Sequence, residues 1–511
     1  MVFTIMQGEK VIFMKNFFNS TRNQTLRSSV KGAILQGLAP DGGLYVCEDL
    51  GTSPIDLHTL LDLTYEEMAP IILSSLLPGF TKEELKTAVS NAYGNSFSTK
   101  EITPLQSVGN DYVLELFHGP TSAFKDVALQ MLPQLMSLSL KEEPDKKVMI
   151  LTATSGDTGK AALCGFQDVE RTGIIVFYPK DGTSKIQQLQ METQEGKNTG
   201  VCALYGNFDD AQSQVKSFFQ SLGKGEIAHD ENLLFSSANS INIGRLAPQA
   251  VYYFYSYMQL VKQGKISLFD EVDFCVPTGN FGDILAGYYA KLLGLPVHKL
   301  IVASNANHVL TDFFQTGVYD RNRPFHKTLS PSMDILISSN LERLLYYMSG
   351  KNAPYISELM DSLNTKGSYE IKPELLTQLK ELFYAGYSTD EECMQEIHHV
   401  FNTYGYVMDP HTAVGYHVMK EYQKQHNDHP CILLSTASPY KFSAQVYEAI
   451  EGTVPTVDEF ELMELLSKRT NTSIPKNLAQ LKTMPVLHDD IVTKEQLKDY
   501  VLSKTEQLLS K

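Results

Sequence analysis

The chain has 511 residues, of which 43% are hydrophobic and 20% are charged, and its formal net charge is −16. This length exceeds what one compact core usually supports, so we expect two or three domains. The acidic balance argues against nucleic acid as the main partner, although a local cluster of positive charge would still bind an anionic small molecule.

Cysteine usage and hydropathy predict a soluble cytoplasmic protein. The six cysteines are widely spaced, with no CxxC pair and no metal-ligand pattern, and several lie in apolar runs typical of buried thiols in a reducing compartment. No apolar stretch is long enough to span a membrane, and residues 1–14 lack the basic region and cleavage site of a signal peptide. Met14 is a candidate native start, because the organised sequence begins near Lys15.

Residues 1–98 are predicted to form a separate N-terminal α/β domain. A turn of proline, aspartate and two glycines at residues 40–43 separates two short extended runs. Residues 56–93 have helical patterning, and Thr81 with Glu84 matches a capping box at the start of a helix.

Residues 99–455 alternate between β-rich apolar runs and helical segments, which predicts an α/β region with a mostly parallel sheet. The stretch 306–400 interrupts this alternation and is interpreted as a helical insertion, with a second capping box at Ser388 and Glu391. Residues 456–511 are predicted to be a helical C-terminal extension. The clearest strands are residues 113–117, 148–152, 173–178, 272–276, 300–303 and 431–435.

Lys125 is the most informative single residue, because it stands in an apolar frame after a strand and a Gly-Pro turn. A desolvated lysine has a lowered pKa and is a ready nucleophile toward carbonyls. The alternative is a surface lysine at a helix start, with its stem lying on the core.

The loops that follow strands matter next, because ligands of parallel sheets bind at the carboxyl ends of the strands. Residues 152–160 place glycines and hydroxyls before a predicted helix at 161–167, and residues 277–283 precede another at 284–293. Both loops would expose backbone N–H groups to a carboxylate or a phosphate. The first loop is also compatible with a plain turn whose Ser and Thr residues cap the helix.

Two further loops carry candidate polar groups. Residues 239–245 set Arg245 before a helix, where its guanidinium would clamp a phosphate, although a surface salt bridge is the commoner role of an arginine. Residues 435–442 follow a strand, and a hydroxyl there would either bond a ring nitrogen or shape a turn.

The histidines are less informative. His118 is equally compatible with a catalytic and a structural role, and His411 is only suggestive. The adjacent His398 and His399 are interpreted as part of a solvated helix face rather than a metal pair, because neighbouring helix positions point apart.

A lysine able to form a Schiff base, together with a phosphate-binding cup, is what pyridoxal phosphate requires of a protein. With this lysine and the loops described above, the chain resembles the threonine synthases, in the branch with an extra N-terminal domain found in bacteria and fungi. The most specific motifs are Pro-Thr-Ser-Ala-Phe-Lys-Asp at residues 120–126 and Thr-Gly-Asn-Phe-Gly-Asp at residues 278–283. The resemblance runs from residue 19 to about residue 445 and rests on residues 20–22, 39–45, 118–130, 154–159, 239–245, 277–283 and 435–442.

The resemblance implies a fold and a reaction. The fold would be the tryptophan synthase β-like, type II pyridoxal phosphate fold, with two open α/β domains, the smaller at about residues 140–260. The enzyme would be a lyase that converts O-phospho-L-homoserine and water into L-threonine and phosphate, by γ-elimination and then β-addition of water. This would be the last step of threonine biosynthesis, carried out by a monomer or homodimer with pyridoxal 5′-phosphate as cofactor and no metal.

The resemblance also implies residue roles. Lys125 would bind the cofactor covalently and act as the catalytic base. Thr436 would face the pyridine nitrogen, and the cofactor phosphate would be held by Gly279, Asn280, Phe281, Gly282 and Asp283. The substrate would be bound by Ser155, Gly156, Asp157, Thr158 and Gly159 at its carboxylate, and near its phosphate by Ser240, Asn242 and Arg245.

Some positions depart from the family pattern, and other functions stay open. Asn19 stands where a tyrosine is common, and Ser438 and Tyr440 stand where many relatives carry His and Ala. The alternatives are a threonine-synthase-like phospho-lyase, a serine/threonine dehydratase, and a non-catalytic metabolite-binding protein on the same scaffold. The Ser-Thr-Arg and Pro-Asp-Gly-Gly signatures favour a threonine synthase over a dehydratase.

Overall fold

The computed structural model describes residues 17–154, 156–180, 182–206, 208–223, 226–227 and 230–509. The predictions about a signal peptide and a start at Met14 concern residues outside these ranges, as does the predicted role of Ser155.

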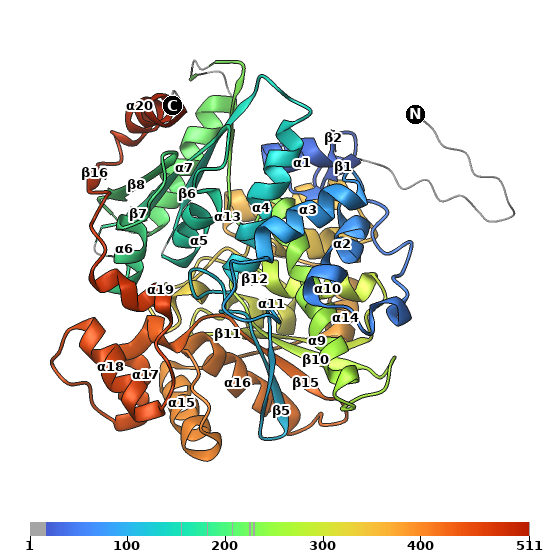
Figure 1. Ribbon diagram of the computed structural model, residues 1–511. Coiled ribbons are helices and arrows are strands. Elements are labelled where there is room, and N and C mark those ends of the chain that lie inside the picture. Colours follow the sequence, from blue (N-terminus) through green and yellow to red (C-terminus); the bar gives the residue numbers. More distant parts are fainter. Residues whose placement is uncertain are drawn as a thin grey trace, which may run out of the picture.

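The N-terminal part has its own antiparallel sheet, in the order β2-β1-β3. The predicted capping box at Thr81 and Glu84 is confirmed at the start of α3. Figure 1 shows the helices of this part gathered on one side of the molecule, where α2 packs on α9 (Ala250–Lys262) and where α1 and α3 pack on α4 (Lys125–Leu140). The elements are β1 (Phe17–Ser20), β2 (Arg27–Ser29), α1 (Val30–Gln36), β3 (Tyr45–Val46), η1 (Leu57–Leu60), α2 (Tyr65–Leu76) and α3 (Lys82–Tyr93).

The main sheet has six strands in the order β14-β11-β10-β15-β5-β4. Neighbouring strands pair in parallel except for β4 and β5, which confirms the prediction of a mostly parallel sheet. Side chains alternate between two cores, because Phe274 and Val276 face one and Cys275 faces the other. The strands are β4 (Leu105–Val108), β5 (Asp111–Glu115), β10 (Val272–Pro277), β11 (Val297–Ser304), β14 (Phe383–Tyr387) and β15 (Cys431–Ser435).

Helices cover both faces of the main sheet. One face carries α16 (Pro410–Gln423), and the other carries α10 (Gly282–Leu292) and α9 (Ala250–Lys262). The helix predicted at 284–293 is α10. It begins two residues earlier than predicted, at Gly282, so residues 282 and 283 lie in its first turn. Short helices before α9 are α8 (Ile243–Leu246) and η2 (Ala247–Gln249).

A second sheet has five parallel strands in the order β16-β8-β7-β6-β9. All eight residues of β7 are buried, as expected for a parallel strand with helices on both faces. The strands are β6 (Lys147–Ala153), β7 (Thr172–Pro179), β8 (Thr199–Leu204), β9 (Leu233–Ser236) and β16 (Asp490–Val492).

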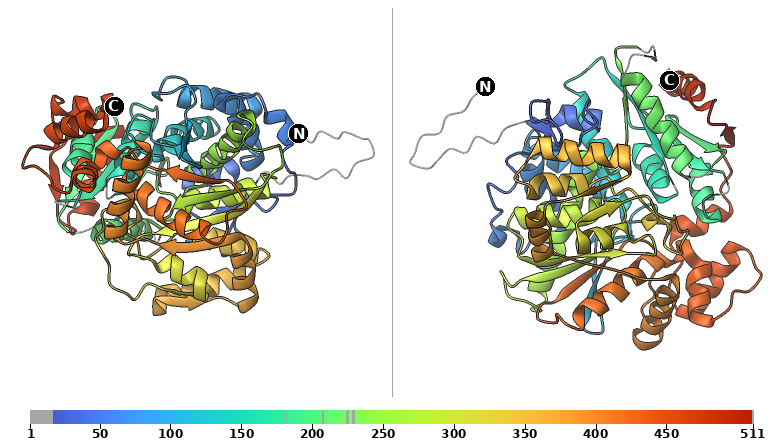
Figure 2. Two further views of the ribbon diagram at one scale, coloured as in Figure 1. Left: turned by 90° about the horizontal axis from the view of Figure 1, so that it is seen from below. Right: turned by 180° about the vertical axis from the view of Figure 1, so that it is seen from behind.

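The helices around the second sheet come from distant parts of the chain. Towards the main sheet lie α4 (Lys125–Leu140), α5 (Asp157–Phe166) and α6 (Lys185–Glu192). The far face is covered by α7 (Phe208–Gly223) and by the C-terminal α20 (Leu497–Leu509), which Figure 2 shows in red beside the green helix. The helix predicted at 161–167 begins at Asp157, so part of the predicted loop is already helical.

The stretch 306–400 is largely helical, as predicted, but it also returns β14 to the edge of the main sheet. The second capping box is one residue later than predicted, at Thr389 and Glu392, because the Ser388 hydroxyl donates to the Thr389 carbonyl instead of capping. The remaining elements are α11 (Val309–Thr316), β12 (Val318–Asp320), η3 (Pro331–Met333), α12 (Leu341–Met348), α13 (Ala353–Lys366), β13 (Ser368–Glu370), α14 (Pro373–Leu382) and α15 (Asp390–Tyr404).

The predicted C-terminal extension is helical but also contributes β16 to the second sheet. Before it come η4 (Pro439–Phe442) and α17 (Ser443–Glu451), and it contains α18 (Glu459–Thr470), α19 (Lys476–Ala479) and η5 (Gln480–Lys482). Within the described ranges, none of the helices has the length and apolar character needed to cross a membrane.

Candidate active site

Lys125 is the first residue of α4. It is 8% exposed, so its side chain is buried. Its Nζ donates to the Ser332 hydroxyl at 3.2 Å and lies 3.6 Å from Asp157 Oδ2. The alternative of a surface lysine is therefore excluded.

The surroundings of Lys125 favour the neutral amine. Burial lowers the pKa of Lys125 to about 8, because the charged ammonium loses its hydration, and the nearby charges of Arg245 and Lys441 lower it further against the attraction of Asp157. An amine in this state is a nucleophile and a proton acceptor near neutral pH.

Asp157 forms a buried ion pair that the sequence did not reveal. Its Oδ1 lies 2.6 Å from Lys441 Nζ and accepts a hydrogen bond from Gln187 Nε2 at 2.8 Å. Burial opposes its charge, but the ammonium groups of Lys441 and Lys125 outweigh this and hold the pKa of Asp157 well below its usual range. Gly156 approaches so closely that a Cβ there would lie 2.5 Å from Gln187 Cδ.

The loop at 279–283 is held in an unusual conformation at the N-terminus of α10. Phe281 is buried with φ +62°, a left-handed backbone that costs a phenylalanine free energy and is kept by its packing. A Cβ on Gly279 would lie 2.7 Å from the carbonyl oxygen of Ser332, so only glycine fits there. The arrangement leaves the first N–H groups of α10 available to an anion.

Asp283 lies in the first turn of α10 and faces two tyrosines of α9. Its Oδ1 accepts from the hydroxyls of Tyr252 at 2.5 Å and Tyr253 at 3.0 Å. Burial raises the pKa of Asp283 to about 6, although these two hydrogen bonds oppose the rise. Its Oδ2 is buried and has no hydrogen-bond partner among the described residues.

The loop at 239–245 lies against the loop at 279–283. A Cβ on Gly282 would lie 3.4 Å from the Cβ of Ser240. Asn242 is committed to structure, because its side chain accepts from the Gly244 N–H and donates to the carbonyl of Ile34.

Arg245 is a buried guanidinium, 5% exposed, that donates to the Ala238 carbonyl at 2.8 Å. Burial lowers the pKa of Arg245 to about 10. No carboxylate of the described chain forms an ion pair with it, so the surface salt bridge considered from the sequence is excluded for these residues. A buried cation in this state favours an anionic ligand.

Thr436 follows β15 and lies beside the segment that carries Lys125. Its carbonyl accepts from the Phe124 N–H at 2.8 Å, and Ala437 forms an isolated bridge with Ala123. The departures from the family pattern nearby have structural partners: Ser438 Oγ accepts from the Tyr440 N–H, and the Tyr440 hydroxyl bonds Thr472.

The residues missed from the sequence lie in the supposed insertion. Ser332 touches Lys125, and residues just before α12 hold the loop at 279–283, because Ser338 Oγ donates to the Gly279 carbonyl and the Asn340 N–H donates to that of Asn280. These residues lie far in the sequence from the loops that they contact, so no local pattern predicts them. Among their partners, His411 was suggested by the sequence, and it accepts from the Ser332 N–H at 3.1 Å.

The Ser-Thr-Arg motif lies at the other end of this arrangement. Arg22 Nε and Nη2 donate to the two carboxylate oxygens of Glu342 at 2.9 and 2.8 Å, and Thr21 Oγ1 donates to Oε1 at 2.5 Å. The N-terminal part is therefore hydrogen-bonded to the first turn of α12, the helix that follows Ser338 and Asn340.

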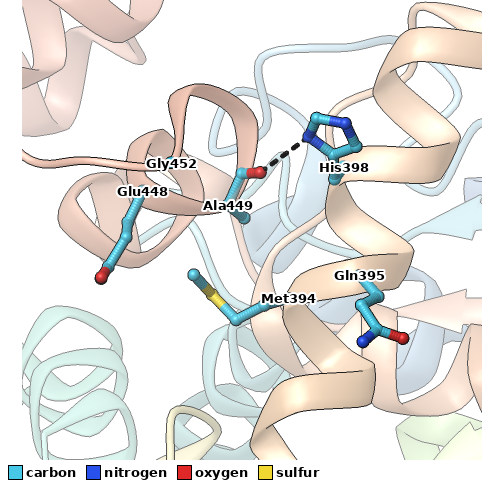
Figure 3. Close-up of a pocket in the computed structure, with 6 residues that line it drawn as sticks. All are labelled: Met394, Gln395, His398, Glu448, Ala449 and Gly452. Atoms are coloured by element: carbon cyan, nitrogen blue, oxygen red, sulfur yellow. Dashed lines mark hydrogen bonds between the residues drawn. The ribbon is translucent and has the colours of Figure 1, made fainter.

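The remaining histidines have structural partners. His118 Nε2 bonds Glu115 Oε2 at 2.8 Å. Figure 3 shows His398 at a cavity of about 370 Å³ between α15 and α17, where its Nδ1 bonds the Ala449 carbonyl at 3.0 Å. No group of three or more His, Cys, Asp or Glu side chains among the described residues has the arrangement of a metal site.

Comparison with known proteins agrees with this geometry. Residues 17–93 match the family model "Threonine synthase N terminus", residues 103–436 match "Pyridoxal-phosphate dependent enzyme", and residues 412–491 match "Threonine synthase, C-terminal". The central match alone covers more than half of the chain.

Three proteins show the extent of the similarity. The human protein named "Threonine synthase-like 1" is 38% identical over 91% of this chain, but the chain covers only 62% of that relative. The threonine synthase of Pseudomonas aeruginosa is 37% identical, over 92% of this chain and 98% of the relative. The crystal structure of pyridoxal-phosphate-bound threonine synthase from Brucella melitensis has a TM-score of 0.84 and 35% identity, over 96% of this chain and 99% of the other.

Proposed function

Because this chain belongs to the threonine synthase family of pyridoxal-phosphate-dependent enzymes, we propose that it converts O-phospho-L-homoserine and water into L-threonine and phosphate. The reaction would be the last step of threonine biosynthesis, carried out in the cytoplasm by a monomer or homodimer without nucleic acid or membrane as a partner. The six cysteines are free and five are buried, which supports a reducing compartment.

The observation that carries the proposal is the buried guanidinium of Arg245, which forms no ion pair with a carboxylate of the described residues. Its charge acts on Lys125, so the two groups lie close together. A buried cation is costly unless an anion completes it. A phosphate-bearing cofactor and a phosphate-bearing substrate supply that anion.

The residues present fit pyridoxal 5′-phosphate. The lowered pKa of Lys125 suits covalent attachment to an aldehyde, and the glycine loop before α10 leaves N–H groups for a phosphate. Asp283 can be neutral there near pH 6, since burial raises its pKa to about 6. When bound, the cofactor would draw electrons from the substrate's α-carbon and so ease loss of its proton.

The chain's own residues then have distinct roles in the proposal. Lys125 Nζ takes the proton from the α-carbon and moves protons between neighbouring carbons, which permits departure of phosphate from the γ-carbon and addition of water at the β-carbon. Thr436 presents a neutral hydroxyl, rather than a carboxylate, to the ring nitrogen. Arg245 and Ser240 bind the substrate phosphate, and Asn242, whose side chain is bonded to Gly244 and Ile34, holds the loop that carries them.

The substrate carboxylate is assigned to the start of α5, at Ser155, Gly156, Asp157, Thr158 and Gly159. Backbone N–H groups at a helix start favour an anion; those of Gly156 and Gly159 also donate to Thr154 Oγ1 at 2.9 Å. The Asp157 carboxylate is compatible with this role because Lys441 neutralises it at 2.6 Å.

We also propose that residues 1–98, 99–455 and 456–511 are the structural units of the enzyme, with a smaller inner domain at 140–260 and an insertion at 306–400. The separate three-stranded sheet supports the first boundary, and the five-stranded sheet supports the inner domain.

The test is to measure phosphate and threonine released from O-phospho-L-homoserine by the purified, cofactor-loaded protein. Equal amounts of both are expected. Phosphate with 2-oxobutanoate instead of threonine would show a phospho-lyase, and no phosphate from a protein that holds its cofactor would overturn the proposal in favour of a dehydratase or a binding protein.

A further inference from the structure

Residues 328–334, which we call the strap, cross the site next to Lys125. Ser332 in the strap accepts a hydrogen bond from Lys125 Nζ at 3.2 Å, and its own hydroxyl lies 3.4 Å from Asp157 Oδ2 as a donor. The carbonyl of Ser332 also fills the space that a Cβ on Gly279 would need. One residue thus touches the reactive amine, its ionised neighbour and the phosphate loop.

A buried aspartate–histidine pair holds the strap in this position. His411 Nε2 accepts from the Ser332 N–H at 3.1 Å, and His411 Nδ1 lies 2.6 Å from Asp409 Oδ2. The Ser332 N–H donates only to an unprotonated nitrogen, so the ring hydrogen lies on Nδ1 and points to Asp409. Asp409 is itself fixed, because it caps α16 by accepting from the N–H groups of His411 and Thr412.

The base of the strap is anchored separately. Asp334 accepts from the Thr328 N–H at 3.0 Å and from Asn305 Nδ2 at 2.8 Å. Ser330 Oγ accepts from Asn305 Nδ2 at 3.0 Å. These contacts hold the ends of the strap. His411 instead contacts Ser332, the strap residue whose hydroxyl accepts from Lys125 Nζ.

We propose that Ser332 is a further catalytic residue of this site and that His411, held by Asp409, is the positioning residue that sets the Ser332 hydroxyl beside Lys125 Nζ. The inference rests on the proposed role of Lys125 as the reactive amine. A neutral amine has two N–H donors and one lone pair. When Ser332 accepts one N–H, that N–H is directed at the strap and the lone pair is directed away from Ser332.

The chemistry required of Ser332 is orientation, and no bond is made or broken at its oxygen. The hydroxyl accepts from Nζ and donates to Asp157, which uses its one donor and one of its two acceptor lone pairs. Alignment of a nucleophile within hydrogen-bond reach contributes to rate without contributing to the affinity of a ligand that does not react.

The test separates capture of the cofactor from its binding. The full-length protein, stripped of cofactor, is mixed with pyridoxal 5′-phosphate and the rate of covalent capture is followed by absorbance. Affinity is measured in parallel with pyridoxine 5′-phosphate, which has the phosphate but no aldehyde. Borohydride trapping and mass spectrometry identify Lys125 as the captured residue.

We expect Ser332→Ala to slow capture about tenfold while leaving pyridoxine 5′-phosphate affinity within about threefold. Ser332→Thr, which keeps the hydroxyl, should capture within about threefold of the parent. The matched control is Ser330→Ala, which removes a hydroxyl from the same strap without touching Lys125 and should also remain within about threefold.

His411→Phe should slow capture in the same direction, and the double variant with Ser332→Ala should be no slower than Ser332→Ala alone, because His411 acts through Ser332. His411→Gln replaces the phenylalanine variant if that one does not fold. Parental capture by Ser332→Ala would overturn the proposal, as would losses that multiply in the double variant or that equally affect pyridoxine 5′-phosphate binding.

Neither measurement uses O-phosphohomoserine. A parent that captures its cofactor at Lys125 but makes no threonine would overturn the proposed function and leave this result standing. A parent that does not capture the cofactor at Lys125 would overturn both.

Discussion

Lys125 and its three charged neighbours form a small electrostatic unit. Arg245 and Lys441 oppose a positive charge on Lys125, and Asp157 supports it from 3.6 Å. Asp157 is nearer to Lys441, at 2.6 Å, and shares its charge between the two lysines. Burial is the largest cause of the lowered pKa of Lys125; Asp157 opposes it, and Arg245 and Lys441 add to it.

The first prediction concerns the pH dependence of this amine. We expect capture of pyridoxal 5′-phosphate to speed up with pH, to be half-maximal near pH 8 and to level off above it, because only the neutral amine attacks an aldehyde and the pKa of Lys125 is lowered to about 8. Stopped-flow absorbance between about pH 6 and about pH 10 measures the profile. Lys125→Ala is the control and should show no capture, whereas a rate that climbs steadily to the top of the range would contradict the prediction.

The second prediction concerns the buried ion pair. We expect Lys441→Met to destabilise the protein by about 3–5 kcal/mol, because it leaves the Asp157 carboxylate buried with a weaker partner. Adding Asp157→Asn should restore a large part of the loss, since the uncompensated charge is then gone. Thermal unfolding of the parent and of both variants measures the difference.

The same pair gives a pH dependence with a defined sign. The pKa of Asp157 is held below its unfolded value, so the pair stabilises the protein above that value and is lost as pH falls through the folded one. Without Lys441 the folded pKa moves up, so acid destabilisation should begin at a higher pH in Lys441→Met. Identical acid profiles for the parent and this variant would contradict this account.

At the scale of single elements, α15 shows how one hydrogen bond sets a helix start. Thr389 accepts from the Glu392 N–H, and the Glu392 carboxylate accepts from the Thr389 N–H at 2.8 Å. Ser388 and Glu391 have the same spacing in the sequence, but Ser388 is buried and its hydroxyl donates to the Thr389 carbonyl. Spacing alone could not choose between the two pairs.

The third prediction follows from this register. We expect Thr389→Ala to weaken the first turn of α15 by about 1 kcal/mol, and Glu391→Ala to have a smaller effect. Amide hydrogen exchange in the first turn measures both. Equal protection in the two variants would show that the cap does not determine where the helix begins.

The strands that the sequence predicted are the ones with the simplest environment. Val272–Pro277 and Cys431–Ser435 are buried along their whole length, so an uninterrupted apolar run was a sufficient signal. Phe383–Tyr387 was missed because it lies at the sheet edge, is half-exposed and follows directly on a helix. Leu233–Ser236 and Asp490–Val492 are too short to show a pattern.

The site was predicted where it depends on loops after strands, and it was missed where it depends on tertiary contact. Lys125 and the glycines at 279 and 282 belong to local motifs. Ser332 has no such motif, because its place is fixed by His411 and by the missing side chain of Gly279. Lys441 lies in the family motif at residues 435–442, but nothing in the local sequence indicates that its partner is Asp157.

At the scale of the whole molecule, the N-terminal part is connected to the site through α12. Arg22 binds Glu342 with two hydrogen bonds, and Glu342 is 5% exposed. Asn340, two residues earlier, donates to the carbonyl of Asn280 in the loop at 279–283. The hydrogen bonds between Arg22 and Glu342 thus support the loop at 279–283 from outside the six-stranded and five-stranded sheets.

The fourth prediction tests this connection. We expect Arg22→Ala to lower the affinity for pyridoxine 5′-phosphate about tenfold, because it leaves the buried Glu342 carboxylate without its partner and loosens the start of α12. The double variant with Glu342→Gln should recover most of the affinity. Isothermal titration calorimetry measures the binding.

Arg27→Ala is the matched control for that experiment. Arg27 lies in the neighbouring strand with its guanidinium 4.4 Å from the ring of Phe17, and among the described residues it forms no hydrogen bond or ion pair with α12. Its replacement should leave the affinity unchanged. An equal loss in both arginine variants would show a general weakening of the N-terminal part instead of a specific connection.

The order of strands in the two sheets also determines when the protein can fold during its synthesis. The outer neighbour of β8 is β16, so the second sheet waits for residues 490–492 to leave the ribosome. In the main sheet β5, at residues 111–115, waits in the same way for β15 at 431–435. Until then, unpaired strand edges remain open to other chains, which exposes the nascent protein to aggregation. A chain built in this way cannot complete either sheet until residues 431–435 and 490–492 have been made.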